Sequence, residues 1–186
     1  MELIRSFIAV EIEDPAVLKK LIEVRNRFVA TGAELKPVED ENIHLTLRFL
    51  GEIPEETVKK VAEILEKLNK PGFKIRVAGV GAFPTPHNPR VIWAGVSEGA
   101  ENIVEIYRAI EKEVRKLGIP AEREEFVPHI TLARVKGRRG LASVTRLILE
   151  LEKHDFGETP VTRICLKKSV LTPRGPIYSD LYVKKL

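Results

Sequence analysis

The same short motif occurs twice in this sequence. His44-Leu-Thr46-Leu and His129-Ile-Thr131-Leu lie 85 residues apart (129 − 44). The same offset relates the flanking segments, which pair as follows: 6–12 with 91–96, 15–30 with 100–117, and 55–69 with 141–153. A repeat of this length, with matching element types around it, indicates an internally duplicated chain.

Each half has the same predicted order of strand, helix, histidine strand, helix and strand. Hydrophobic periodicity predicts these elements at 3–12, 15–30, 43–50, 55–69 and 73–82, then at 90–96, 100–117, 129–135, 141–153 and 161–172, with a last strand at 177–185. Three prolines mark residues 82–90 as a loop. We expect one domain with two lobes, about 1–85 and 86–186, and a cleft into which each lobe contributes one His-x-Thr strand. By itself, the alternation of strands and helices suggests parallel sheets.

Composition narrows the class of protein. A chain of 186 residues can bury a sizeable core, and its net charge of +4 mildly favours an anionic partner such as RNA. No apolar run approaches the roughly 20 residues of a membrane span, and the first residues lack the features of a secretory signal. With Cys165 as the only cysteine, we expect a cytoplasmic protein without disulfides or a membrane association. The absence of glutamine and the many Lys and Glu residues are typical of proteins that work at high temperature.

The paired histidines favour acid–base chemistry. A strand places residues i and i+2 on one face, so each histidine shares a face with its threonine. An imidazole titrates near pH 6.5, so one copy can remove a proton while the other donates one, each transfer contributing roughly 10²- to 10⁴-fold in rate. This arrangement suits displacement at phosphorus, with the hydroxyls of Thr46 and Thr131 donating to phosphate oxygens and no metal required. A single His-x-Thr would more often be structural; two in matched positions favour function.

Two arginines follow the motifs. Arg48 shares strand parity with His44 and Thr46 and is therefore predicted to add positive charge to the cleft. Strict alternation turns Arg134 away from the face of His129, unless a bulge re-aims it. The basic run 134–139 is either a solvated loop or a rim that attracts phosphate.

The two His-x-Thr-Leu strands in a duplicated chain of this size resemble the 2H phosphoesterases. The most similar branch is that of the RNA 2′,3′-cyclic phosphodiesterases, also called 2′-5′ RNA ligases. The likeness runs along the whole chain through FIAVEI, HLTLRFLGE, GVGAFP, PRVIWAGV, FVPHITLAR and LTPRGPIYSDLYVKKL. This resemblance implies an α+β fold with two antiparallel-sheet lobes, helices outside, and the motifs facing each other across a central cleft.

The resemblance also implies a reaction. In it, an RNA end with a 2′,3′-cyclic phosphate is hydrolysed to a 2′-phosphate. His44 donates a proton to the leaving 3′ oxygen, and His129 accepts one from water; symmetry alone does not assign these roles. Arg134 matches a phosphate-contacting arginine. In the reverse direction, an RNA 5′-hydroxyl in place of water would form a 2′-5′ linkage. We expect a monomer that needs no cofactor.

Several assignments stay open on the sequence. Phe83 and Phe126 are candidates for stacking on a base, with core packing as the alternative, and Tyr178 is a candidate for the cleft. His87 and His154 are interpreted as surface residues, Trp93 as core. Alternative functions are a phosphodiesterase acting on a small substrate (ADP-ribose 1″,2″-cyclic phosphate or a 2′-5′ oligoadenylate), a non-catalytic RNA- or nucleotide-binding module, and a zinc hydrolase, for which a third ligand is missing from the motifs.

Overall fold

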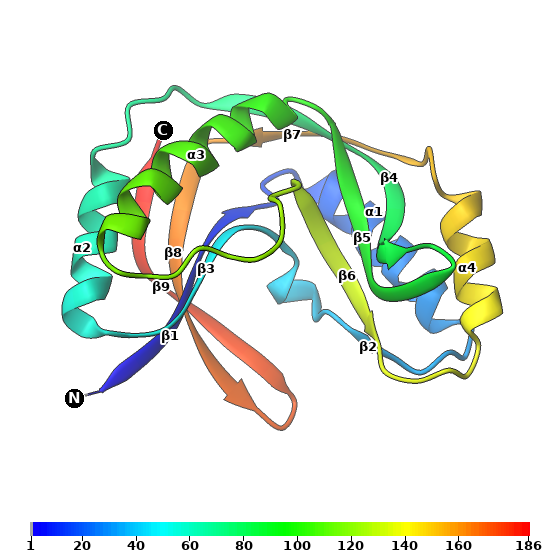
Figure 1. Ribbon diagram of the computed structural model, residues 1–186. Helices are drawn as coiled ribbons and strands as arrows, with labels where there is room; N and C mark the ends of the chain where they lie inside the picture. The colour runs from blue at the N-terminus through cyan, green and yellow to red at the C-terminus, as the bar shows by residue number, and fades with distance from the viewer. Residues whose placement is uncertain (1) are drawn as a thin grey trace.

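The computed structural model describes residues 2–186 as an arched β-sheet with four helices packed on it (Figure 1). The strands are β1 (Leu3–Glu11), β2 (Leu35–Pro37), β3 (His44–Pro54), β4 (Phe73–Thr85), β5 (Asn88–Glu98), β6 (His129–Val135), β7 (Asp155–Val161), β8 (Arg163–Thr172) and β9 (Gly175–Lys185). The helices are α1 (Pro15–Val29), α2 (Glu55–Glu66), α3 (Ala100–Lys116) and α4 (Leu141–Glu150), with a 3₁₀ turn at Asp40–Asn42. No helix of this described part combines the length and the hydrophobicity needed to cross a bilayer.

The observed elements differ from the predicted ones in three places. The strand predicted at 161–172 is β8, and a further strand that was not predicted, β7, precedes it and is separated from it by a break at Thr162. The loop predicted at 82–90 is instead the end of a β4–β5 hairpin, in which Pro84 lies opposite Pro89. Prolines are tolerated there because the tip of a hairpin needs few ladder hydrogen bonds. The short strand β2 has no sequence signal of its own; it forms by pairing with β6.

All strand pairs of the sheet are antiparallel, in the order β7-β4-β5-β6-β3-β1-β8-β9, with β2 on β6. The α+β class and the antiparallel pairing implied by the resemblance are therefore confirmed, and the parallel sheets suggested by element order alone do not occur among residues 2–186. The reason is where the helices pack. Helix α1 follows β1 but packs on β7, at the far edge of the sheet, and on the central strand β6, so the chain does not make a βαβ crossover between β1 and β3.

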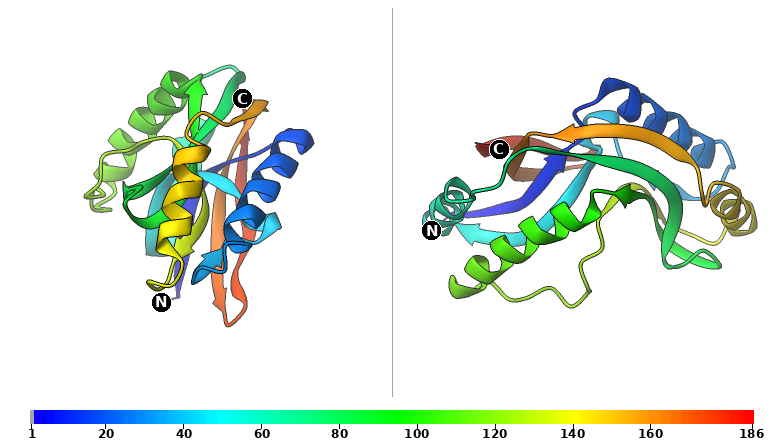
Figure 2. Two further views of the ribbon diagram at one scale, coloured as in Figure 1. Left: turned by 90° about the vertical axis from the view of Figure 1, so that its right-hand side faces the viewer. Right: turned by 90° about the horizontal axis from the view of Figure 1, so that it is seen from above.

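The two sequence halves interlock in space. Strand β4 pairs with β5 and β7 of the second half, while β8 and β9 extend the sheet beyond β1. Helices α2 and α3 contact each other and both pack on β3, whereas α1 packs on β6 and β7 and α4 on β4 and β5 (Figures 1 and 2). One cluster of buried side chains runs beneath all four helices.

Local signals explain where the first helix begins. The carboxylate of Asp14 accepts hydrogen bonds from the backbone N–H groups of Ala16 and Val17 at 2.9 and 3.1 Å, and Pro15 occupies the first helical position. The buried residues of α1 recur at helical spacing: Val17, Leu21, Val24 and Phe28.

Candidate active site

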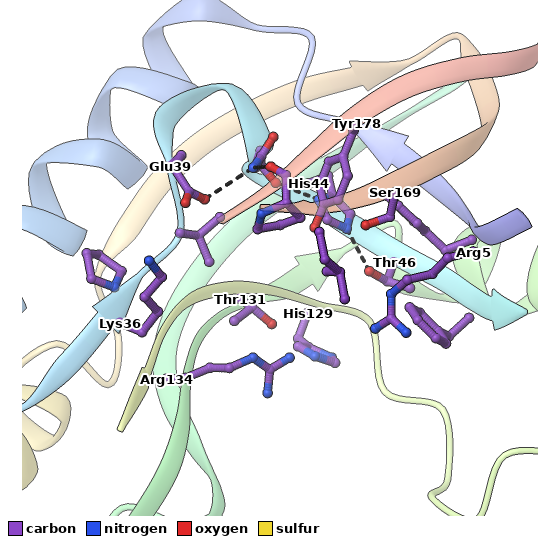
Figure 3. Close-up of a pocket in the computed structure, with 17 residues that line it drawn as sticks. Arg5, Lys36, Glu39, His44, Thr46, His129, Thr131, Arg134, Ser169 and Tyr178 are labelled. Carbon is purple, nitrogen blue, oxygen red and sulfur yellow. Dashed lines mark hydrogen bonds between the residues drawn. The ribbon is translucent and has the colours of Figure 1, made fainter. Parts of the chain in front are cut away.

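The two motif strands meet at the middle of the sheet. Strands β3 and β6 pair antiparallel through Leu45 and Ile130, both fully buried on the helix-covered face. In antiparallel register this pair sets His44 opposite Thr131 and Thr46 opposite His129. All four side chains line one cavity on the concave face of the sheet (Figure 3). The duplicated motifs therefore face each other about a local twofold axis.

Each imidazole is oriented by a backbone carbonyl two residues earlier. Nδ1 of His44 lies 2.6 Å from the carbonyl oxygen of Asn42, and Nδ1 of His129 lies 2.7 Å from that of Val127. A carbonyl only accepts, so Nδ1 carries the hydrogen in both rings. Nε2 is then the working atom, and in His44 it lies 2.8 Å from the hydroxyl of Thr46 (Figure 3).

Both imidazoles favour the neutral form in the free protein. Burial lowers the pKa of His44 below 6.5, and the Lys167 ammonium adds to this effect, while the bond to the Asn42 carbonyl opposes it. Burial also lowers the pKa of His129, with a smaller contribution from the positive charge of Arg134. A phosphate anion between the rings would favour protonation of one of them.

A β-bulge follows each motif at the same place in the repeat. On β3, Ala9 pairs with Thr46 and Ile8 with Arg48, so Leu47 is an extra residue. On β6, Trp93 pairs with Thr131 and Ile92 with Ala133, so Leu132 is the extra one. Each bulge shifts the alternation by one residue.

The bulges decide which side chains enter the cleft. Arg134 is turned to the concave face, where it lines the cavity beside His129 and Thr131 (Figure 3). Its counterpart on β3 is Phe49, which also lines the cavity and is 37% exposed.

The prediction that Arg48 adds charge to the cleft is wrong. Its side chain is only 2% exposed and points to the opposite face, because the bulge at Leu47 reverses its parity. There Nε bonds to the Glu111 carboxylate of α3 at 2.5 Å, and Nη2 donates to the Pro120 carbonyl at 2.6 Å. Arg48 is thus a buried structural cation that links β3 to α3.

Two adjoining cavities meet at Thr46, His129 and Thr131, which line both of them. The first, of about 320 Å³, contains both histidines and threonines, with the cations Arg5, Lys36 and Arg134 and one carboxylate, Glu39, on its wall. The second, of about 780 Å³, opens beside His129 and continues along the segment 122–127, which supplies Glu122, Glu124 and Glu125. The first cavity therefore has more cations than carboxylates, whereas in the second the three carboxylates face two cations, Arg90 and Arg134.

The aromatic candidates divide between these cavities. Tyr178 lies edge-on to His44 with ring centroids 5.5 Å apart. Phe83 lies edge-on to His129 at 5.0 Å, and Phe126 stacks on Tyr107 at 4.1 Å with an interplanar angle of 7°, both on the wall of the second cavity. Trp93, interpreted as core, is half-buried with its ring 6.4 Å from that of His129.

Sequence reasoning missed Arg5, Lys36 and Phe49 as cleft residues. Arg5 and Lys36 come from strands that carry no motif, and only strand pairing brings them to the cavity (Figure 3). Strand alternation did not place Phe49 in the cleft, because the bulge reverses its direction. The repeat does indicate its position, since Phe49 lies 85 residues before Arg134 (134 − 49).

One side-chain group within residues 2–186 has metal-like spacing, namely Glu11, Cys165 and Asp180. It includes neither motif histidine. The ammonium of Lys167 already pairs with Asp180 at 2.8 Å and with Glu11 at 3.5 Å, so the group carries its own cation. Burial raises the pKa of the Cys165 thiol to about 12, which keeps it protonated.

Comparisons with known proteins agree with this geometry. The family model described as LigT-like phosphoesterase matches the chain twice, at residues 10–93 and 95–178, and the two matches begin 85 residues apart (95 − 10). A protein of Aeropyrum pernix named RNA 2′,3′-cyclic phosphodiesterase is 42% identical over 89% of this chain and 94% of its own length. One of Archaeoglobus fulgidus with the same name is 37% identical over 96% and 98%.

Solved structures resemble the fold over its full length. The Thermus thermophilus protein TT0787 superposes with a TM-score of 0.78 at 32% identity, covering 98% of this chain and 97% of its own. LigT of Escherichia coli, solved in complex with 3′-AMP, superposes with a TM-score of 0.80 over 100% and 99%, and at 23% identity this likeness concerns the fold alone. The two matches to this family model together span most of the chain. The chain therefore belongs to the LigT-like phosphoesterase family.

Proposed function

We propose that this protein hydrolyses the 2′,3′-cyclic phosphate at an RNA end to a 2′-phosphate, without a metal. The observation that carries the proposal is the reciprocal arrangement of two His–Thr pairs across β3 and β6. An acid and a base on opposite sides of one small cavity suit in-line displacement at phosphorus. The relatives named RNA 2′,3′-cyclic phosphodiesterase support the substrate class.

The chemistry follows from the two Nε2 atoms. With the phosphate between the motifs, neutral His129 takes a proton from water as its oxygen attacks phosphorus. Protonated His44 gives its proton to the 3′ oxygen as the P–O3′ bond breaks. The hydroxyls of Thr46 and Thr131 donate to the two non-bridging oxygens, and Arg134 adds positive charge where the transition state is most anionic.

The charged rim favours RNA over a small nucleotide. Arg5, Lys36 and Arg134 outnumber the single carboxylate on the first cavity, and Lys/Arg side chains contribute most of the affinity for a phosphate backbone. Small cyclic nucleotides and 2′-5′ oligoadenylates remain the second substrate class, since the catalytic groups would be identical. A binding module without catalysis would need the cations but not a matched acid and base.

The decisive experiment is product analysis. Purified protein is incubated in excess EDTA with an oligonucleotide that ends in a 2′,3′-cyclic phosphate. We expect a 2′-phosphate end, resistant to 3′-phosphate-specific removal. A 3′-phosphate product would contradict the assigned bond cleavage, and unchanged substrate would favour the small-nucleotide or the binding-module alternative.

The roles of the histidines are tested by substitution. We expect His44→Ala and His129→Ala each to lower turnover more than about a hundredfold, because each removes one of two proton transfers. His87→Ala is the matched control, since His87 lies at the β4–β5 turn and lines neither cavity described above. Circular dichroism checks that all three variants fold. Near-normal turnover in either motif variant would disprove the mechanism.

We infer a monomer acting in the cytoplasm, where the free thiol of Cys165 fits a reducing environment. Light scattering at assay concentration tests the oligomeric state. Ligation through a 2′-5′ linkage would use the same groups in reverse, with a 5′-hydroxyl strand on the side of His129.

A further inference from the structure

A mostly buried ammonium group near the cleft takes no part in the mechanism proposed above. The Lys167 side chain on β8 is only 12% exposed and pairs with Asp180 of β9 at 2.8 Å and with Glu11 of β1 at 3.5 Å. We infer that Lys167, held in this way, is a positioning residue that acts through His44 and makes its imidazolium a stronger proton donor. The inference rests on the proposed function, because it concerns the acid in that reaction.

Strand pairing brings this ion-pair network to His44. Glu11 lies directly opposite His44 in the antiparallel β1–β3 pair, and residues directly opposite in such a pair project from one face with Cβ atoms about 4.5–5.5 Å apart. On the other side of β1, Lys167 is opposite Phe7, whose ring centroid lies 5.1 Å from that of His44. The carboxylate and the ammonium therefore both belong to the surroundings of His44.

The repeat identifies Phe83 as the counterpart of Lys167 in the second half. Lys167 is the partner of Phe7 on β1, and Phe83 is the partner of Val91 on β5. Phe7 and Val91 are equivalent, because each pairs with the second residue after the bulged one, on β3 and on β6. The Phe83 ring lies 5.0 Å from that of His129. The duplicated sheet thus places a phenyl ring beside one histidine at the position where it places an ammonium near the other.

The remaining surroundings of the two histidines differ in the same way. Gly95 is opposite His129, at the position that Glu11 has opposite His44, and the ring of Trp93 lies 6.4 Å from that of His129. The two motifs are therefore alike, but the first is backed by charges and the second by apolar groups. Such a difference suits two histidines that perform different steps of one reaction.

The direction of the effect follows from the sign of the charge. A fixed positive charge destabilises the imidazolium relative to the neutral imidazole, so Nε2 of His44 releases its proton more readily to the 3′ oxygen as the P–O3′ bond breaks. Burial is the main cause of the lowered pKa of His44, and the Asn42 carbonyl opposes it; among the charged side chains, Lys167 lowers this pKa more than Glu11 raises it. The Glu11 charge is also offset by Arg163 at 3.1 Å.

The network keeps the ammonium charged and away from the phosphate. Burial lowers the pKa of Lys167, but the hydrogen bond to Asp180 and the charge of Glu11 outweigh this effect and raise the pKa above 10.5. Unlike the three cations of the first cavity, Lys167 is not on the wall of either cavity. Its charge therefore acts on the histidine and not by contact with the substrate.

The test changes the charge in opposite directions and follows the titration of His44 by NMR. The Cε1–H resonance of His44 is assigned by its loss in His44→Ala. We expect Lys167→Met to move the titration midpoint to higher pH by roughly 0.5–1 unit, less than the ~1–3 units that a directly adjacent charge produces. Glu11→Gln should move the midpoint to lower pH, because the ammonium is then less compensated. Lys167→Arg keeps the charge and should titrate as the wild type does.

The same variants are then compared in steady-state kinetics. On the oligonucleotide with a 2′,3′-cyclic phosphate end, the alkaline limb of kcat/KM should move in the same direction as the titration midpoint of each variant. Other charged or titratable groups share the cavity of His44 and are unchanged in all variants: Arg5, Lys36, Glu39, His129, Arg134 and Tyr178.

The control is Lys168→Met, which removes the next lysine of β8. Strand alternation turns Lys168 to the face opposite Lys167, so neither the titration of His44 nor the kinetic profile should change. Movement of the midpoint in one direction in both Lys167→Met and Glu11→Gln would show a structural effect and overturn the inference, as would no movement in either. A moved titration with an unmoved alkaline limb would also overturn it. If the wild-type protein turns over no cyclic-phosphate substrate, the proposed function fails and the donor role with it, whereas the titration still decides whether Lys167 acts on His44.

Discussion

At the scale of single residues, the protonation of the two imidazoles sets the pH dependence. Burial lowers the pKa of both His44 and His129 below 6.5, so both are mostly neutral in the free protein at pH 7. In the active form the proton donor His44 is protonated and the proton acceptor His129 is neutral. It is therefore most populated below pH 6.5 and is lost at higher pH as the proton donor deprotonates, and at lower pH as the acceptor protonates.

We expect kcat/KM to follow a bell with its maximum on the acid side of about pH 6.5, the ordinary value for histidine. The pH profile of kcat should have its alkaline limb at a higher pH than the profile of kcat/KM, because the bound phosphate anion raises the pKa of the neighbouring imidazole. Both parameters are measured on the cyclic-phosphate oligonucleotide at constant ionic strength. A profile of kcat/KM that still rises between pH 7 and 8 would contradict a low-pKa proton donor.

At the scale of secondary-structure elements, a buried ion pair ties β3 to α3. Arg48 is 2% exposed and Glu111 14%, and their contact lies behind the strand that carries His44 and Thr46. Removing one partner leaves the other charge buried without compensation, which is costly, whereas removing both is much less so.

We expect Arg48→Met to lower the free energy of unfolding by roughly 3–5 kcal/mol, and Arg48→Met combined with Glu111→Leu to recover much of that loss. Urea denaturation of the three proteins measures the difference. If the double variant were as unstable as Arg48→Met alone, the stability would depend on the backbone contacts of Arg48 with Phe49 and Pro120 and not on the ion pair.

At the scale of the whole molecule, the exchange of strands makes the two halves dependent on each other. Strand β4 has its partners β5 and β7 only in the second half, and β1 pairs with β8 on its outer side. Neither half alone can complete its sheet, so each would expose unpaired edges and apolar faces.

We expect calorimetry of the full chain to give one transition, with equal calorimetric and van't Hoff enthalpies. Its midpoint should lie above the roughly 45–65 °C of mesophilic domains, given the composition. Fragments 1–85 and 86–186 should each show no cooperative unfolding. A folded isolated half, or two resolved transitions, would contradict a single cooperative domain.

The sequence by itself determined the repeat and most helices and strands. It also determined that His44 and Thr46 share one side of their strand, as do His129 and Thr131. These features depend on local periodicity, which a short window of residues contains. The antiparallel pairing was not derivable in this way and came from the family resemblance.

Only the tertiary structure decided the directions of Arg48, Phe49 and Arg134. Each lies beyond a bulge, and a bulge exists only where a partner strand leaves one residue unpaired, at Leu47 opposite β1 and at Leu132 opposite β5. The same holds for Arg5 and Lys36, which reach the cleft through strand pairings distant in sequence. Side-chain direction past such a point depends on long-range register and not on the residues themselves, because one extra residue reverses the face of every residue that follows.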